Sequence, residues 1–413
     1  MQPAQEPASA EAPPAQPAQE PPPVAAPPAP PGQDFAERVS CPKCGGADTA
    51  WVVELGQMRC QDCRSTFVLD ASGVASLVND DVANLRGSEF SVGASQDVAE
   101  SEDQVMTLRC PSCGAEMVVQ AANLAGVKCH WCRNQLSPAN RIPNGARPDG
   151  IVPFTVTREQ AKASMQEFLK KRRAFANRKF LAQYTLENIQ PVYFPYFMVD
   201  LNAKADHRGL GAHLVRKHTK KQGDSSTTYY DYDIYSFERR FDLLVNDLLV
   251  PSNAEFANQD ARLNTHNIIN SVAPWDTHAT VPYDPHYLQG EFRAERRTSN
   301  VSEVRGLVGG QLVDISHVQA NKTMPYYDHG VMYQHDDVQV QGERWVTLLC
   351  PVWVYSYLEV RSKGPMLHYI AVNGTNGKTI GSVPTSKARM LVVAGVAQVV
   401  GMVAGVIWLI LGG

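Results

Sequence analysis

Residues 110–132 read CPSCGAEMVVQAANLAGVKCHWC, and residues 41–63 read CPKCGGADTAWVVELGQMRCQDC. Each stretch carries two CxxC pairs, and the spacing between the pairs is the same in both. This pattern is typical of a four-thiolate zinc site, in which each pair forms a tight turn and the residues between form a hairpin. A glycine follows each first pair, Gly45 and Gly114, and its missing Cβ favours the turn. The sequence therefore predicts two small β zinc ribbons, each folded around one structural Zn²⁺.

Eight of the nine cysteines belong to this pattern and are the predicted metal ligands. They are Cys41, Cys44, Cys60 and Cys63 in the first ribbon, and Cys110, Cys113, Cys129 and Cys132 in the second. Disulfide bonds and redox-active pairs are the less favoured alternatives, because the spacing repeats and the N-terminus lacks the pattern of a secretory signal. His130 lies within the last CxxC pair, but four thiolates already complete a tetrahedral zinc site. The ninth cysteine, Cys350, lies in an apolar run and is expected to be buried without a chemical role.

Composition divides the 413-residue chain into six segments, which predict a multidomain α+β protein. The predicted segments are a disordered Pro/Ala-rich tail (1–37), the first ribbon (38–68), an acidic linker (69–105), the second ribbon (106–142), a mainly β α+β domain in the cytoplasm (143–386) and a C-terminal transmembrane anchor (387–413). The formal net charge is −4, so no global charge excess indicates a nucleic-acid partner.

A helix that ends in a basic run is predicted near the start of the α+β domain. Thr157 and Gln160 have the spacing of a capping box. The apolar residues behind them have helical spacing: Ala161, Met165, Phe168 and Leu169. The basic run is Lys170, Lys171, Arg172 and Arg173. Two interpretations fit this run equally well: favourable charge at a helix C-terminus, or a patch that binds anionic lipid or a partner.

Residues 190–386 are rich in strand signals. The stretches 192–199, 227–249, 310–315, 331–340 and 345–360 predict strands, and 253–270 predicts a polar helix. Residues 191–197 (PVYFPYF) resemble residues 351–357 (PVWVYSY), which fits either a duplicated unit or a chance likeness of two aromatic strands. The sequence NGTNGKT at 373–379 predicts a hairpin turn, since Val372 occupies the position where a phosphate-binding loop needs glycine.

Residues 390–411 form an uncharged apolar stretch at the C-terminal end of the sequence. As a helix it is about 33 Å long, enough to cross the hydrocarbon core of a bilayer. Lys387 and Arg389 precede it, and the positive-inside rule then keeps the preceding domain in the cytoplasm. Gly401 and Gly405 have the spacing of a helix-packing motif; this indicates either a homo-oligomer or a frequent chance match in such a span.

The sequence contains none of the common catalytic signatures, such as HExxH or a nucleophile elbow. Each predicted ribbon uses all four zinc positions for cysteine, which leaves no open position for water. We therefore expect a protein that is not an enzyme.

With ribbons, middle domain and tail considered together, the chain resembles bacterial membrane-anchored proteins with TFIIB-type zinc ribbons. The likeness covers residues 106–411 and rests on five stretches: IVPF (151–154), PVYFPY (191–196), YLQGEFRAE (287–295), PVWV (351–354) and VNGTNGK (372–378). Some relatives carry a primosomal-helicase-like label because of their ribbons, yet no helicase motor motif is present here. Some are encoded beside flotillin-like (SPFH) and PspA-like proteins, and the resemblance implies that they hold such partners at the membrane. The first ribbon and the Pro/Ala-rich tail depart from the family pattern.

These observations lead to one principal hypothesis and one alternative. The principal hypothesis is a non-enzymatic, tail-anchored adaptor in the bacterial inner membrane, whose ribbons and α+β domain bind proteins in the cytoplasm, SPFH-like or PspA-like partners among them. The alternative is a membrane-tethered protein that binds nucleic acid through its zinc ribbons.

Overall fold

The computed structural model describes residues 40–68, 81–97, 105–121, 126–185, 188–222, 225–254, 266–361 and 364–411. The predicted tail (1–37) lies outside these residues. So do parts of the predicted acidic linker (69–80 and 98–104) and most of the predicted polar helix (255–265). Among the described residues the strands form a three-stranded sheet and a large mixed sheet of twelve strands.

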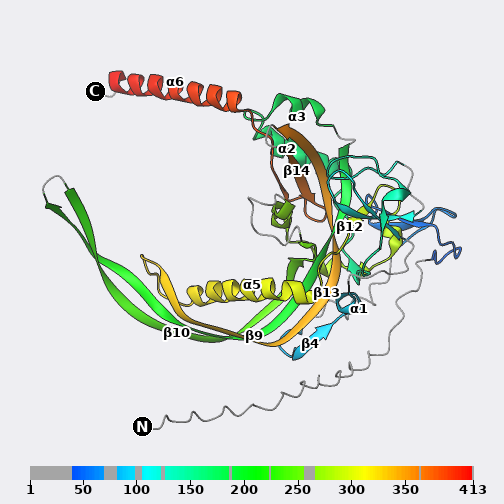
Figure 1. Ribbon diagram of the computed structural model, residues 1–413, viewed down its shortest axis with the longest axis horizontal. Helices are drawn as coiled ribbons and strands as arrows, with labels where there is room; N and C mark the ends of the chain where they lie inside the picture. Colours follow the sequence, from blue (N-terminus) through cyan, green and yellow to red (C-terminus); the bar gives the residue numbers. More distant parts are fainter. Residues whose placement is uncertain are drawn as a thin grey trace, which may run out of the picture. The chain divides into compact units, whose positions relative to one another are not determined.

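Two very long strands, β9 (Ile189–Gln222) and β13 (Val331–Arg361), are the centre of the large sheet. They pair with each other in antiparallel register, and β10 (Ser225–Pro251) pairs antiparallel with the other edge of β9. Register shifts interrupt both pairings, for example between Val245 and Leu248. Such bulges bend a strand and increase its twist. Figure 1 accordingly shows β9, β10 and β13 as a curved band.

Shorter strands extend this sheet on both sides. In order across the sheet they are β11 (Val281–Pro282), β8 (Gly150–Ile151), β13, β9, β12 (Arg293–Glu295), β6 (Glu116–Gln120), β5 (Val105–Arg109) and β7 (Arg141–Ile142). Strand β14 (Gly364–Asn373) pairs with β13 and with β15 (Thr379–Gly381). The turn between β14 and β15 confirms the hairpin that was predicted at residues 373–379.

The second cysteine-rich stretch is part of the large sheet, whereas the first has a sheet of its own. Strand β6 pairs with β12, which in turn pairs with β9. The first stretch forms a separate antiparallel sheet of β1 (Thr49–Val52), β2 (Gln57–Cys60) and β3 (Thr66–Phe67). In the described part of the predicted acidic linker, β4 (Gly87–Phe90) pairs in parallel with β13, and α1 (Val92–Ser95) follows it.

The prediction of a strand at residues 310–315 is wrong, because these residues lie within helix α5 (Val301–Lys322). Its buried residues recur at helical spacing: Val301, Val304, Val308, Leu312, Ser316 and Ala320. The first four of them pack with residues of β9, β10 and Trp345 of β13 in one hydrophobic cluster. Figure 1 shows α5 lying along the band of long strands. This tertiary packing outweighs the local strand preference of the β-branched residues and the low helix propensity of the paired glycines.

The predicted helix after Thr157 is confirmed as α2 (Arg158–Lys170). Thr157 Oγ1 accepts a hydrogen bond from Gln160 N, and Gln160 Oε1 accepts one from Thr157 N, so the predicted capping box is present. The four predicted apolar residues are buried. A turn leads from α2 to α3 (Arg178–Gln183).

The two similar aromatic stretches lie side by side in the sheet. Val192 of β9 faces Val352 of β13, and the flanking pairs run in opposite directions from this point. The two stretches are therefore related by a local two-fold arrangement of their backbones. Cys350 faces Phe194 and is fully buried, as predicted, and burial raises the pKa of its thiol.

The apolar C-terminal stretch is a single helix, α6 (Lys387–Leu411), drawn in red in Figure 1. Its window Ala388–Gly405 is long and apolar enough to cross a membrane, and none of that window is buried within the protein. The structure thus contains one candidate membrane-spanning helix among its described residues.

Candidate metal centres

The eight predicted ligand cysteines form two clusters of four. In the first cluster, the Sγ atoms of Cys41 and Cys63 are 3.5 Å apart, and those of Cys44 and Cys60 are 3.6 Å apart. The second cluster repeats this arrangement, with 3.4 Å between Cys110 and Cys132 and 3.5 Å between Cys113 and Cys129. Within each cluster all four sulfurs lie within 4.8 Å of one another.

These distances fit the four corners of a small coordination tetrahedron. Zinc–sulfur bonds of about 2.3 Å imply sulfur–sulfur separations of about 3.8 Å. The eight thiols are all free, so none of them is consumed in a disulfide bond. Four soft sulfur donors around one point favour zinc or an iron–sulfur centre over magnesium or calcium. Each cluster can therefore hold one metal ion without a change of fold.

All four CxxC turns have the same backbone geometry. In each turn the residue after the second cysteine donates its N–H to the carbonyl of the first, as Gly114 does to Cys110 at 2.9 Å. That residue has positive φ in every case: 72° for Gly45, 61° for Arg64, 81° for Gly114 and 63° for Arg133. The predicted glycine positions are confirmed, but the two arginines were missed. The signal was present, because the same residue type follows the second pair in both stretches.

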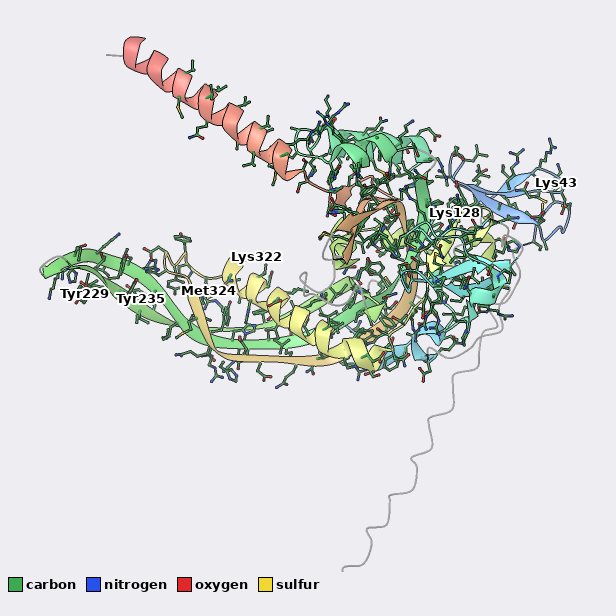
Figure 2. The ribbon with its side chains drawn as sticks, turned by 45° about the horizontal axis from the view of Figure 1, so that its top comes forward. Lys43, Lys128, Tyr229, Tyr235, Lys322 and Met324 are labelled. Carbon is green, nitrogen blue, oxygen red and sulfur yellow. The ribbon has the colours of Figure 1, made fainter. Side chains whose placement is uncertain are left out.

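A buried carboxylate supports the second cluster from outside it. Glu295 of β12 is 3% exposed, and its Oε1 lies 2.6 Å from His130 Nε2 and accepts a hydrogen bond of 2.6 Å from Trp131 Nε1. His130 and Trp131 lie within the last CxxC pair, so this contact holds the turn against the large sheet. His130 lies outside the cysteine cluster. Figure 2 labels Lys128, which immediately precedes that pair within the second cysteine-rich stretch.

The first cluster is attached to the α+β domain by its hairpin and by a 3-10 helix, η7 (Pro285–Leu288). Trp51 Nε1 donates to the carbonyl of Phe154 at 3.0 Å, and its ring packs against Tyr287 with centroids 5.5 Å apart. Gln289 Nε2 donates to Asp48 Oδ1 at 2.8 Å. The buried Met58 of β2 belongs to the same hydrophobic cluster as Tyr193 of β9. Side chains therefore connect this small sheet to the large one, and no strand pairing joins them among the described residues.

The polypeptide around the clusters lowers the pKa of Cys41 and Cys63 in the first and of Cys113 in the second, which favours the thiolate at these positions. A hydrogen bond with the Ser65 hydroxyl lowers the pKa of Cys41 to about 6. A hydrogen bond with Cys129 lowers the pKa of Cys113 to about 5. The thiolate, not the thiol, is the form that binds a metal.

A third group of donor atoms combines His207 of β9, His317 of α5 and Asp336 of β13. Asp336 Oδ1 lies 2.9 Å from His207 Nδ1 and 2.8 Å from His317 Nε2. These are ordinary hydrogen-bond lengths, so two ring N–H groups that share one carboxylate oxygen account for the geometry. The group connects α5 to the long strands, and no spacing pattern along the chain predicts it.

The predicted basic patch is exposed and lies where α6 begins. Lys170, Lys171, Arg172 and Arg173 are all exposed at the end of α2 and in the turn after it. Arg389 in the first turn of α6 donates to the carbonyl of Arg173. This contact was not predicted, because more than two hundred residues separate the two elements in the sequence.

A group of exposed aromatic residues on the two faces of the β9–β10 hairpin was not predicted as a site. Its members are Tyr229, Tyr230, Tyr232 and Tyr235, which are 39–49% exposed. Tyr230 and Tyr232 stack on one face with ring centres 6.3 Å apart, whereas Tyr229 and Tyr235 lie on the other face. Basic side chains from β9 lie over two of the rings: Lys217 Nζ is 5.5 Å from the ring centre of Tyr230, and Lys220 Nζ is 5.7 Å from that of Tyr229. Figure 2 shows Tyr229 and Tyr235 on the outer part of this hairpin.

No family model and no solved structure matches the chain. The chain is similar to an uncharacterized protein of Bacillus subtilis (strain 168), YdjG, with 23% identity over 259 residues. The match covers 61% of this chain and 68% of that protein. The name of that protein states no activity, so the similarity indicates no function for this chain.

Proposed function

We propose that this protein is a non-enzymatic, tail-anchored adaptor in the bacterial inner membrane. Helix α6 crosses the bilayer, and the two cysteine clusters each hold a structural Zn²⁺ in a zinc ribbon. The ribbons and the α+β domain then present binding surfaces to partner proteins in the cytoplasm. The SPFH-like and PspA-like proteins implied by the family resemblance are the first partners to test.

The observation that carries the proposal is the fully exposed apolar window of α6. An isolated apolar helix of this length is stable in a bilayer and costly in water. The metal sites support a structural role, because four cysteines fill the coordination sphere of zinc and leave no position for substrate or water. The exposed tyrosines on the two faces of the β9–β10 hairpin support partner binding, since tyrosine is enriched at protein interfaces.

Crosslinking in intact membranes, followed by identification of the captured proteins, tests the adaptor role. The native chain is compared with a variant in which Tyr229, Tyr230 and Tyr235 are replaced by Ser. A second variant with Glu159→Gln on α2 and Asp314→Asn on α5, at exposed positions outside the ribbons and the hairpin, serves as a control for surface changes elsewhere. We expect defined partners with the native chain and the control, and their loss with the tyrosine variant. Failure of the native chain to capture any protein reproducibly would contradict the adaptor role.

The pairing of lysines with tyrosine rings on the hairpin favours one second candidate, a membrane-tethered nucleic-acid binder. Basic side chains interleaved with aromatic rings bind single strands through phosphate contacts and base stacking. Such binding weakens steeply as salt is raised. The full chain in detergent, with a labelled single-stranded oligonucleotide at about 50 mM salt, tests this candidate. An absence of binding at that salt concentration removes it.

A further inference from the structure

The turn between α2 and α3, residues 170–179, is bonded directly to the start of α6. Ser386 N donates to the carbonyl of Phe175 at 2.9 Å, and Asn177 N donates to the carbonyl of Pro384 at 2.8 Å. These backbone hydrogen bonds fix the turn beside the residues that precede α6. We call residues 170–179 the α2–α3 turn.

The side chain of Arg389 strengthens this junction. Its Nη1 donates to the carbonyl of Ala176 at 2.8 Å and to the carbonyl of Arg173 at 3.2 Å. Arg389 is followed at once by the uncharged stretch that begins at Met390. The α2–α3 turn therefore lies within one side-chain length of the point where the apolar part of α6 begins.

The surface of the α2–α3 turn is strongly basic. Its exposed basic residues are Lys170, Lys171, Arg172, Arg173, Arg178 and Lys179. Glu167, on the last turns of α2, lies 3.5 Å from Lys171 and offsets one charge. Glu359 of β13 also lies beside the turn, where its Oε1 accepts a hydrogen bond of 3.5 Å from Asn177 Nδ2. The positive charges outnumber these carboxylates, and Phe175, 39% exposed, adds an apolar side chain among them.

We propose that the α2–α3 turn is a docking surface for the headgroups of anionic phospholipids at the point where α6 enters the bilayer. The inference rests on the proposed anchoring by α6. If α6 crosses the membrane, its first turn lies at the headgroup level, and the α2–α3 turn is held there with it. Basic residues at that level attract anionic lipid within a Debye length of about 8–10 Å. The bilayer itself occupies the space beside the turn, so lipid is favoured over nucleic acid.

The experiment uses the full chain in phosphatidylcholine vesicles with about three-tenths phosphatidylglycerol. Carbonate extraction first measures membrane integration. Mild detergent then releases the chain, and the ratio of the two lipids that copurify with it is compared with the bulk ratio. The test variant carries Lys170→Gln, Lys171→Gln and Arg173→Gln. The matched control carries Arg216→Gln, Lys217→Gln and Lys220→Gln on the β9–β10 hairpin, with the same loss of charge. Arg172 is left unchanged because its guanidinium packs 3.7 Å from the Phe168 ring centre.

We expect all three chains to resist carbonate, and the native chain and the control to enrich phosphatidylglycerol several-fold over bulk. The test variant should return to the bulk ratio, and added salt should reduce the enrichment of the native chain. If the native chain resists carbonate but does not enrich phosphatidylglycerol, the inference is overturned while the proposed anchor stands. The same holds if the test variant keeps the enrichment of phosphatidylglycerol. A native chain that carbonate strips from the vesicles overturns the anchor and the inference together. If no chain enriches phosphatidylglycerol, and the test variant alone loses binding of a labelled oligonucleotide, the inference is overturned and the surface is assigned to nucleic acid instead.

Discussion

At the residue scale, Glu295 shows how one side chain outside the cysteine cluster can hold a candidate metal site in place. Its carboxylate is buried and is shared by the imidazole of His130 and the indole N–H of Trp131. Both rings belong to the last CxxC pair, while Glu295 belongs to a short strand that pairs with β9. The contact thus connects the chemistry of the second cluster to the centre of the large sheet.

We predict that Glu295→Ala destabilises the protein by about 2–4 kcal/mol, because it leaves two buried polar ring groups without their partner. Urea unfolding of the full chain in detergent, followed by tryptophan fluorescence, measures the change. Glu54→Ala, at an exposed position of the first ribbon, is the control and should change stability by less than about 0.5 kcal/mol. Equal effects of the two substitutions would show that the Glu295 contact carries no stability.

The number of bound metal ions distinguishes the cysteine clusters from the His207–His317–Asp336 group. We predict two equivalents of zinc per chain, since two clusters have four sulfur donors and the third group is satisfied by its own hydrogen bonds. Elemental analysis of the purified full chain measures the stoichiometry. His317→Ala should leave it at two. A third equivalent that disappears with His317→Ala would assign a metal to that group instead.

At the element scale, the attachment of the first ribbon to η7 should depend on pH through His286. Its Nδ1 lies 2.5 Å from Asp284 Oδ1. The hydrogen bond that His286 donates to Asp284 raises the pKa of His286, against the effect of burial, and the Ala47 carbonyl and Asp48 raise it further. The folded-state pKa is therefore above the unfolded value. The stabilisation is complete below the ordinary histidine pKa of about 6.5 and is lost as pH rises through the folded-state pKa.

We predict that raising the pH through this range loosens the first ribbon by about 1 kcal/mol, the order of a screened charge-assisted hydrogen bond. Hydrogen exchange of peptides from β1 and β2, corrected for the intrinsic effect of pH, measures the loosening. His286→Gln should abolish the pH dependence, whereas His278→Gln, at a side chain that is 63% exposed, should preserve it. A ribbon whose protection is independent of pH in the native chain would contradict this account.

The elements also show which parts of the fold can be predicted from the sequence. Patterns set by neighbouring residues were sufficient for the CxxC turns, the capping box of α2, the β14–β15 hairpin and the apolar stretch of α6. Helix α5 was missed because its several valines favour a strand locally and the paired glycines Gly309 and Gly310 weaken the helix signal. Packing against the long strands decides the outcome. The length of β9 and β13 was also underestimated, since polar stretches such as 202–222 continue as strand only because neighbouring strands pair with them.

The residues of the candidate site also fall into those that could be predicted from the sequence and those that could not. The eight cysteines were predicted from spacing alone, because their ligand geometry is local. Glu295, Asp336 and the contact between Arg389 and the α2–α3 turn join residues that are far apart in sequence, and no periodicity records such contacts. Only the folded chain brings them together.

At the scale of the whole molecule, the two cysteine clusters have the same chemistry but different structural positions. The second stretch contributes β5 and β6 to the large sheet, and its buried residues belong to the same hydrophobic cluster as Phe194 of β9. The first stretch forms a separate sheet that is attached by side chains such as Trp51. Metal binding supplies most of the folding energy of a small ribbon, about 10–16 kcal/mol in zinc-finger peptides. Loss of metal should therefore remain local in the first stretch and spread to the large sheet in the second.

We predict that Cys41→Ser with Cys44→Ser removes one zinc and leaves the main thermal transition of the full chain within a few degrees of its native midpoint. Cys110→Ser with Cys113→Ser should also remove one zinc, but it should lower that midpoint strongly, because β6 then no longer supports β12 beside β9. Zinc analysis and far-ultraviolet circular dichroism in detergent provide the two measurements, and each variant is the matched control of the other. Equal thermal shifts would contradict the asymmetry. The expected result would identify the first ribbon as the one that can be unfolded to examine partner binding without disturbing the domain that α6 holds at the membrane.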